Sequence, residues 1–201
     1  MNKGLLIALA VIGVVLLIGA SFAGWGIGVY NKIVSYDEAV HAGWSQVQNQ
    51  YQRRYDLVPN LVESVKGYAK QEKDVLIGVT EARASVGQMK VTPEVLRDPH
   101  AFAQFQQAQD GLGSALSRLM VVVEKYPELK SNENFLELQA QLEGTENRIA
   151  VARMGFNEKV EVYNVMIRHF PGSFVAGFGG FREAQYFQSV QGAEKAPQVK
   201  F

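Results

Sequence analysis

The feature that most constrains this chain is a long uncharged stretch near its N-terminus, GLLIALAVIGVVLLIGASFAGWGIGV, residues 4–29. As an α-helix it would be about 39 Å long, and the hydrocarbon core of a bilayer is about 30 Å thick. Trp25 and Tyr30 lie at its C-terminal end, and amphipathic aromatic rings favour the membrane–water interface. Residues 1–30 are therefore predicted to form an N-terminal membrane anchor that contacts membrane lipid through residues 4–29.

A cleaved signal peptide is the alternative explanation for this stretch. Lys3, the apolar core and the small-x-small sequence at residues 21–23 fit such a peptide. The apolar stretch continues past Ala23, which favours an anchor that stays in place. Lys3 precedes the stretch, whereas Lys32 follows it with acidic residues close behind. The positive-inside rule therefore gives a slight bias toward an N-terminus in the cytoplasm.

The overall composition argues against several classes of protein. The chain has 20 Lys and Arg, 20 Asp and Glu, and no Cys. Phosphate binders usually carry a basic excess, and without Cys there is no disulfide, no Cys-ligated zinc and no thiol nucleophile. His41, His100 and His169 lack the spacing of metal ligands, and no nucleotide-binding or nucleophile-elbow motif is present. We therefore expect no catalytic residue, metal, cofactor, nucleic acid or small-molecule substrate.

Apolar residues recur at steps of three and four after the anchor, which predicts a helix with one core-facing side. Ser35 and Glu38 fit a capping box, which predicts a short break after the anchor and a new helix that begins near Ser35. Pro59 interrupts this helix, and because the stripe keeps its phase we expect a kink or a collinear restart there. The stripe consists of Val40, Trp44, Val47, Tyr51, Tyr55, Val58, Val62, Val65 and Ala69.

Further helical segments follow. A third periodic stretch covers residues 74–89, and the main loop is predicted over residues 87–99. Thr92 and Asp98 each precede a proline and are predicted N-caps. The next helix is expected to stop before Pro127. Its early glutamines are expected to form a solvated face: Gln104, Gln106, Gln107 and Gln109.

The last helix is expected to be the longest. After a cap at Ser131 or Asn132, apolar residues from Phe135 to Phe170 keep a near-heptad spacing over about 55 Å of helix. Long helices joined by short loops pack as bundles. The fold class is therefore predicted as all-α: an N-terminal single transmembrane helix, then an elongated antiparallel up-and-down helical bundle, residues 31–171, with long coiled-coil-like helices.

Two groups of polar residues lie in the middle of predicted helices, where unpaired charges would be costly. We hypothesise that carboxylates of the last helix pair with arginines near Pro59 across the bundle and fix the helix register. Arginine-rich surroundings keep carboxylates ionised, which favours structural pairing over acid–base catalysis. This predicted polar register network comprises Arg53, Arg54, Asp56, Asn60, Glu63, Glu143, Glu146, Asn147 and Arg148.

The sequence GSFVAGFGGFREAQYF, residues 172–187, is rich in aromatic residues and glycines. In a helix, Phe174, Phe178 and Phe181 would share one face. This C-terminal patch either folds back on its own bundle as a cap, contacts another protomer, or enters the membrane interface. The polar residues 188–201 are predicted to be a disordered tail. The candidate residues for oligomer or membrane contact are Phe174, Phe178, Phe181, Tyr186 and Phe187.

Three long phrases of the sequence resemble the LemA family of small membrane-anchored proteins. They are WSQVQNQYQRRYDLVPNLVESVKGYA, SRLMVVVEKYPELKSNENFLELQAQLEGTENRIAVAR, and FPGSFVAGFGGF with a later YF. The resemblance covers essentially the whole chain. It implies a bacterial single-span membrane protein with an elongated helical bundle and no established activity. It also hints at a membrane-protein partner such as a metallopeptidase.

We expect a non-enzymatic membrane-anchored scaffold that self-associates into a higher-order homo-oligomer at the bacterial membrane, since tethering raises effective concentration. The alternative is an adaptor that recruits or regulates another membrane protein, such as a peptidase, through the glutamine-rich helix or the C-terminal patch. The expected location is the bacterial inner (cytoplasmic) membrane, with the N-terminus in the cytoplasm and the bundle on the periplasmic side.

Overall fold

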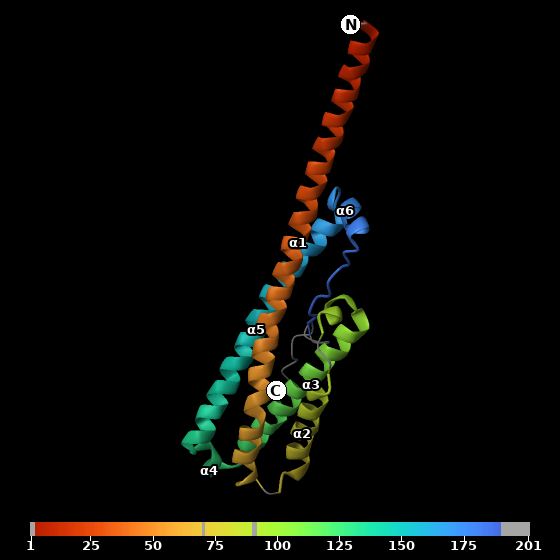
Figure 1. The fold of residues 1–201 in the computed structure, drawn as a ribbon. Helices are drawn as coiled ribbons and strands as arrows, with labels where there is room; N and C mark the ends of the chain where they lie inside the picture. Colours follow the sequence, from red (N-terminus) through yellow and green to blue (C-terminus); the bar gives the residue numbers. More distant parts are fainter. Residues whose placement is uncertain (1–2, 70, 90–91, 190–201) are drawn as a thin grey trace, which may run out of the picture.

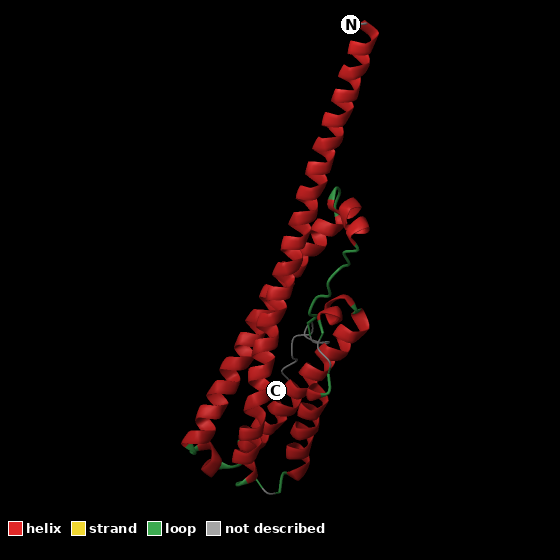
Figure 2. Cartoon of the chain, viewed as in Figure 1, coloured by secondary structure: helices red, strands yellow, loops and turns green. Residues whose placement is uncertain are grey.

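The computed structural model describes residues 3–69, 71–89 and 92–189, and these residues form helices, turns and one extended segment, with no strand among them (Figures 1 and 2). The predicted all-helical class is confirmed over these residues. Most of the predicted tail, residues 190–201, lies outside the described residues. The elements are α1 (Lys3–Lys66), α2 (Lys73–Gly87), the 3₁₀-helix η1 (Pro93–Arg97), α3 (Pro99–Val123), α4 (Pro127–Lys130), α5 (Glu133–Arg168) and α6 (Gly172–Gly179).

Helix α1 is a single helix of 64 residues, about 96 Å long at 1.5 Å per residue. Its N-terminal part is long and apolar enough to cross a membrane, and it continues directly into the helical domain (Figure 1). The predicted break near Ser35 is wrong. Ile33 and Val40, one on each side of Ser35, are both buried, so the core-facing stripe of α1 runs through this position without interruption.

Pro59 lies inside α1 on its exposed side, and the helix continues through it. Proline has no N–H, so the carbonyl of Tyr55, four residues earlier, loses its helical hydrogen bond. Arg83 of α2 replaces this bond, because its Nε donates to the Tyr55 carbonyl at 3.2 Å. Its guanidinium also lies 3.8 Å from the centre of the Tyr55 ring. The side chain that compensates for Pro59 therefore comes from another helix and not from the polar residues near it in sequence.

Helices α1 and α5 pack closely on each other and run in opposite directions. Arg54 of α1 meets Glu146 of α5, and Gln50, one turn earlier on α1, meets Arg148, which lies later on α5. Helices α2 and α3 form the second close pair. The caps of α3 and α5 are confirmed: Asp98 accepts from the N–H of His100 at 2.9 Å, and Asn132 accepts from the N–H of Phe135 at 3.0 Å.

The space between the two helix pairs holds two core clusters. The cluster nearer the apolar N-terminal part of α1 is aromatic and is built around Trp44 and Phe156. The cluster farther from it is mainly aliphatic and is built around Val58, Leu112 and Leu119. Along α1 the change from the first cluster to the second occurs between Tyr51 and Val58.

Candidate functional site

A polar layer lies between the two core clusters, where α1, α3 and α5 meet. Its central residue is Arg54, which is only 3% exposed. One guanidinium nitrogen of Arg54 donates to both carboxylate oxygens of Glu146, at 3.0 and 3.2 Å. The other donates to the backbone carbonyl of Gln109 at 2.9 Å and to its side-chain oxygen at 2.6 Å. A buried guanidinium needs such partners, so this layer links three helices at one level.

The other residues predicted for the polar register network do not converge on Arg54. Arg148 is nearest in role, since it donates to Gln50 at 3.2 Å and to Thr145 at 3.0 Å. The remaining six are exposed: Arg53, Asp56, Asn60, Glu63, Glu143 and Asn147. Neighbours in sequence point to different sides of a helix, and of the predicted set only Arg54 and Glu146 meet across the core as an ion pair.

The glutamines of α3 differ from the expected solvated face. Gln109 is 4% exposed and belongs to the polar layer. Gln106 bonds to the backbone of Gln188 at 2.8 Å. Gln104 and Gln107 are exposed as expected. The expectation of a solvated face is therefore wrong for Gln109, which bonds Arg54 of α1, and for Gln106, which bonds the C-terminal segment.

Tyr51, whose ring lies beside Arg54 of the polar layer, is not suited to acid–base catalysis near neutral pH. Burial raises the pKa of Tyr51 to about 12, although Arg153 and Arg54 lower it in part. A phenol that holds its proton so firmly is a poor general acid or base. Among the described residues, no group of three or more His, Cys, Asp or Glu side chains is placed to hold a metal ion.

A second polar centre, around Arg97 of η1, joins several parts of the chain. Arg97 donates to the Tyr163 hydroxyl at 3.0 Å and to the carbonyl of Arg182 at 3.1 Å, and it pairs with Asp37 of α1. Burial raises the pKa of Tyr163, and the hydrogen bond from Arg97 offsets part of this shift. Arg97 therefore holds η1, α1, α5 and the chain after α6 together.

The C-terminal segment, residues 181–189, lies extended against α3 and α5 and is held by side-chain amides. Asn164 donates to the Ala184 carbonyl and accepts from the Ala184 N–H, both at 2.9 Å. Asn157 makes the same two bonds with Phe187, at 2.9 and 3.0 Å. Gln106 also bonds both backbone groups of Gln188. Each side-chain amide thus makes the two backbone hydrogen bonds that a neighbouring β-strand would otherwise make.

The spacing of these amides matches the extended backbone. Asn157 and Asn164 are seven residues apart, which is about 10.5 Å along a helix. Ala184 and Phe187 are three residues apart, which is about 10 Å along an extended chain. The two steps agree, so one face of α5 can bind two positions of the segment at once. Backbone groups that would otherwise be unpaired are thereby satisfied.

Phe187 anchors the end of this segment in the aromatic core cluster. It is 6% exposed, and its ring centre lies 4.9 Å from that of Phe102, 5.5 Å from that of Phe156 and 6.0 Å from that of Trp44. This burial excludes Phe187 from any exposed contact surface of the chain. Tyr186, the neighbouring candidate, is 41% exposed.

Folding back on the bundle was one of the three alternatives for residues 172–187, and residues 181–187 do so. Sequence reasoning missed the side chains that hold them, because these are uncharged amides. Asn157 and Asn164 lie at i and i+7 on the side of α5 that also carries Val160 and Tyr163, both fully buried. Two asparagines seven residues apart on this side of α5 were the signal that could have predicted a bound segment. The sequence does not identify that segment, because it follows some twenty to thirty residues later.

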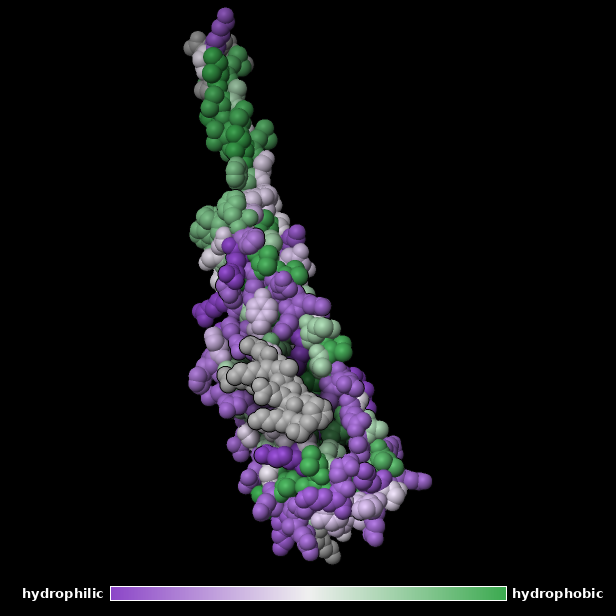
Figure 3. Space-filling model, turned by 180° about the vertical axis from the view of Figure 1, so that it is seen from behind, coloured by the Kyte–Doolittle hydropathy of each residue, from purple (hydrophilic) through white to green (hydrophobic). Residues whose placement is uncertain are grey.

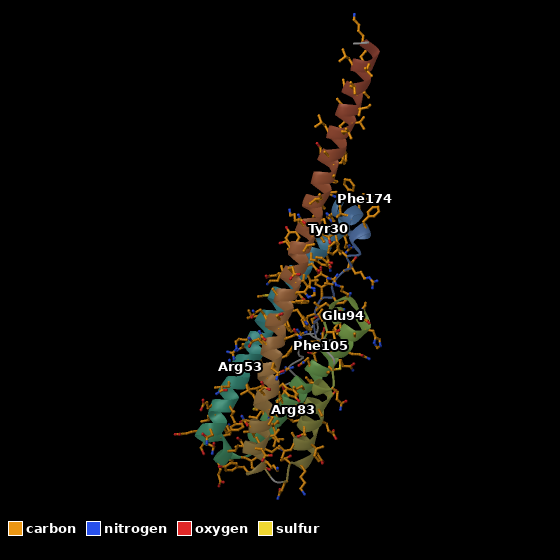
Figure 4. The ribbon with its side chains drawn as sticks, viewed as in Figure 1. Tyr30, Arg53, Arg83, Glu94, Phe105 and Phe174 are labelled. Atoms are coloured by element: carbon orange, nitrogen blue, oxygen red, sulfur yellow. The ribbon has the colours of Figure 1, made fainter. Side chains whose placement is uncertain are left out.

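Helix α6 places a group of phenylalanines beside the end of the apolar stretch of α1. The rings of Phe174 and Phe178 meet edge to face with their centres 5.0 Å apart, and the two residues are 63% and 83% exposed. Phe170, just before α6, is 82% exposed. We call these three residues the aromatic ledge. In Figure 4, Phe174 lies beside the stretch of α1 that carries Tyr30.

The predicted shared helical face is wrong for Phe181. Helix α6 ends at Gly179, and Gly180 has φ +71°, a left-handed conformation that favours glycine at this position. Phe181 follows this turn and packs on Tyr30, with ring centres 5.5 Å apart. Tyr30 thus contacts the C-terminal segment while remaining 44% exposed, and Trp25, one turn earlier, is 47% exposed.

A stripe of exposed apolar side chains also runs along the outside of α5. Val151 and Met154 are 64% and 60% exposed, and Val162 and Val165 are each 47% exposed. Their spacing places them on one face of the helix. Exposed Glu158 lies between the two pairs. We call these four apolar residues the outer stripe.

Comparison with known proteins gives a family and several relatives. The model of the LemA family matches residues 43–201. The chain is 30% identical over 175 residues to magnetosome proteins MamQ 1 and MamQ 2 of Paramagnetospirillum magneticum. It is 31% identical over 174 residues to magnetosome protein MamQ of Magnetospirillum gryphiswaldense. Each match covers 79% of this chain and 64% of the relative. The chain therefore spans less than two thirds of the length of these relatives.

Proposed function

The chain belongs to the LemA family, and we propose that it is a non-enzymatic, membrane-anchored scaffold that self-associates into a higher-order homo-oligomer. The family description and the names of the relatives are not those of enzymes. The apolar part of α1 supports location at a membrane. We place the protein in the bacterial inner membrane, with the N-terminus in the cytoplasm and the helical domain on the periplasmic side, because of the positive-inside bias.

The observation that carries self-association is the outer stripe of α5. Its four apolar side chains are 47–64% exposed in the single chain. Transfer of such side chains from water into a contact is favourable, at about 25 cal/mol per Å² of apolar surface. Exposed apolar side chains grouped on one helix face can mark an interaction site, and here two such pairs flank Glu158. The stripe faces away from the helix pairs that form the core, so a second molecule can cover it without any change in the fold.

The membrane restricts how copies can meet. Copies anchored by the same span stand in the same direction, and their local concentration is raised by confinement to one plane. A two-fold contact through the outer stripe would bring the two Glu158 carboxylates close together. A contact between the stripe of one copy and a different surface of the next avoids this repulsion. Such a heterologous contact forms a ring when its rotation closes.

The proposal is tested by the mass of the full-length protein extracted in a mild detergent. Light scattering gives the protein mass in the complex, and electron microscopy of the same fraction shows whether the particles are uniform. A discrete assembly of many copies is the expected result. A monomer would contradict self-association and favour the adaptor, and the next experiment would then be a pull-down for a stoichiometric membrane-protein partner.

A further inference from the structure

We propose that the aromatic ledge of α6 inserts into the surface of the same membrane that α1 spans. The inference rests on the membrane-anchored part of the proposed function and not on self-association. Helix α6, GSFVAGFG, contains no charged residue. Two of the three ledge phenylalanines are more than four-fifths exposed, although the core of the same chain buries other phenylalanines completely. A group of exposed phenylalanines on one short helix marks a candidate site for contact with a protein or a membrane.

The position of α6 identifies lipid as that partner. A shallow apolar hollow between α6 and α1 is lined by Phe174 and Phe178 on one side, and by Ala23, Ile27 and Tyr30 on the other. These α1 residues form the last turns of the apolar stretch. Ile27 is itself 61% exposed. The ledge is therefore continuous with a surface that lies in or next to the hydrocarbon of the bilayer. Figure 3 shows strongly hydrophobic surface along the N-terminal part of α1 and a paler hydrophobic area just beyond it.

Basic residues surround the ledge in the arrangement expected at a lipid headgroup layer. Arg168 and His169 precede α6 and Arg182 follows it; all three are exposed. Long basic side chains beside an apolar helix can reach phosphate groups while the apolar face enters the acyl boundary. Arg168 is also paired with Glu183 at 3.6 Å, which leaves it at the surface. An apolar helix flanked by cations is typical of interfacial helices.

The attachment of α6 makes this second contact rigid. The segment after α6 is fixed by Arg97, Asn164 and Asn157, and α6 itself packs on both α1 and α5. With a single span, the tilt of the continuous helix α1 sets the tilt of the domain, and one span does not restrict that tilt. A second contact beside the span restricts it, and with it how far the domain stands from the membrane. The outer stripe is then presented in a defined direction.

The experiment uses single-cysteine spin labels on the full-length chain, which has no Cys of its own. Phe178→Cys and Phe174→Cys probe the ledge. Ile27→Cys is the lipid reference and Val121→Cys on α3, outside the outer stripe, is the aqueous reference; all four positions are more than three-fifths exposed. Each labelled protein is reconstituted into vesicles of phosphatidylcholine and phosphatidylglycerol. Power saturation then measures collision of the label with oxygen, which concentrates in lipid, and with a water-soluble nickel chelate.

We expect the oxygen-to-nickel ratio at position 178 to resemble that at position 27 and to exceed that at position 121 several-fold. A ratio at 178 equal to that at 121 would place the ledge in water and overturn the inference. Low collision rates with both reagents would mean that protein covers the ledge, which also overturns it. If the label at position 27 is itself in water, the membrane anchor fails as well, so the two proposals are tested separately.

Discussion

At the scale of single residues, Pro59 and Arg83 show how a defect in one helix is repaired by another. Arg83 donates to the Tyr55 carbonyl that Pro59 leaves unpaired. We expect Arg83→Ala to lower the free energy of unfolding by about 1–2 kcal/mol, through the lost hydrogen bond and the lost contact with the Tyr55 ring. Denaturant unfolding in detergent, followed by helical circular dichroism, measures this change.

A double-mutant cycle separates the two contributions. Pro59→Ala returns an N–H that can bond the Tyr55 carbonyl within α1. In that background Arg83→Ala should cost about 1 kcal/mol less, because only the contact with the ring is lost. An equal cost in both backgrounds would mean that Arg83 does not compensate for the proline.

Arg54 and Arg53 are adjacent in sequence and provide a matched pair. Arg54 is 3% exposed and bonds Glu146 and Gln109, whereas Arg53 is exposed. We expect Arg54→Ala to cost about 2–3 kcal/mol, below the full value for a buried pair because Glu146 is itself 41% exposed. Arg53→Ala should cost less than about 0.5 kcal/mol. Similar costs for both substitutions would reject a role for the polar layer in fixing helix register.

Tyr51 makes stability depend on pH in the alkaline range. Its pKa is raised from 10.0 to about 12, mainly by burial. The unfolded chain therefore loses the phenolic proton at lower pH than the folded chain. The stability contribution is complete below pH 10 and is lost as the pH rises to about 12. A shift of this size corresponds to about 2–3 kcal/mol.

Comparison with Tyr51→Phe isolates this effect from the other tyrosines. No described residue forms a hydrogen bond with the buried Tyr51 hydroxyl. Removing this hydroxyl should therefore leave the free energy of unfolding at neutral pH unchanged or slightly higher. Between pH 10 and 12 the variant should lose less stability than the parent chain, by about 2–3 kcal/mol. Parallel pH profiles for the two proteins would show that Tyr51 is not responsible.

At the scale of elements, the extended C-terminal segment depends on α5. Asn164 is 2% exposed and bonds both backbone groups of Ala184. Asn164→Ala should cost about 1–3 kcal/mol and should increase hydrogen exchange across residues 181–189, because two buried backbone groups lose their partner. Asn147→Ala, on the exposed side of the same helix, is the control. Unchanged exchange in the Asn164 variant would show that other contacts hold the segment.

The elements differ in how well the sequence predicts them. The long helices were predictable because each carries a continuous apolar stripe, and the caps at Asp98 and Asn132 because they act within one turn. The motif at Ser35 was misread as a cap, because Ile33 and Val40 continue the stripe on both sides of it. The partners of Gln109, Asn164 and Arg83 were not predictable, since each depends on a residue brought close only by the fold.

At the scale of the whole molecule, α1 contains both the apolar stretch that is long enough to cross a membrane and part of the core. Trp44 and Val58 of α1 lie in the two core clusters, and the same helix carries the apolar stretch without a break. A tilt of the span is therefore transmitted directly to the helical domain. The aromatic ledge, if it enters the membrane as proposed, gives the domain a second support. Neighbouring copies would then present their outer stripes at the same height and in the same orientation.

If copies meet through the outer stripe of α5, a charge introduced into this stripe should weaken assembly. Val162→Lys places a charge among apolar side chains that a second copy would cover, and burial of an unpaired charge is costly. Val121→Lys on α3 is the matched control, because Val121 is 67% exposed and Val162 is 47% exposed, and neither belongs to the core. Both variants should unfold within about 0.5 kcal/mol of the parent chain. Light scattering in mild detergent should show a smaller mass for the Val162 variant and the parental mass for the Val121 variant. Equal masses for all three proteins would mean that copies meet through a different surface.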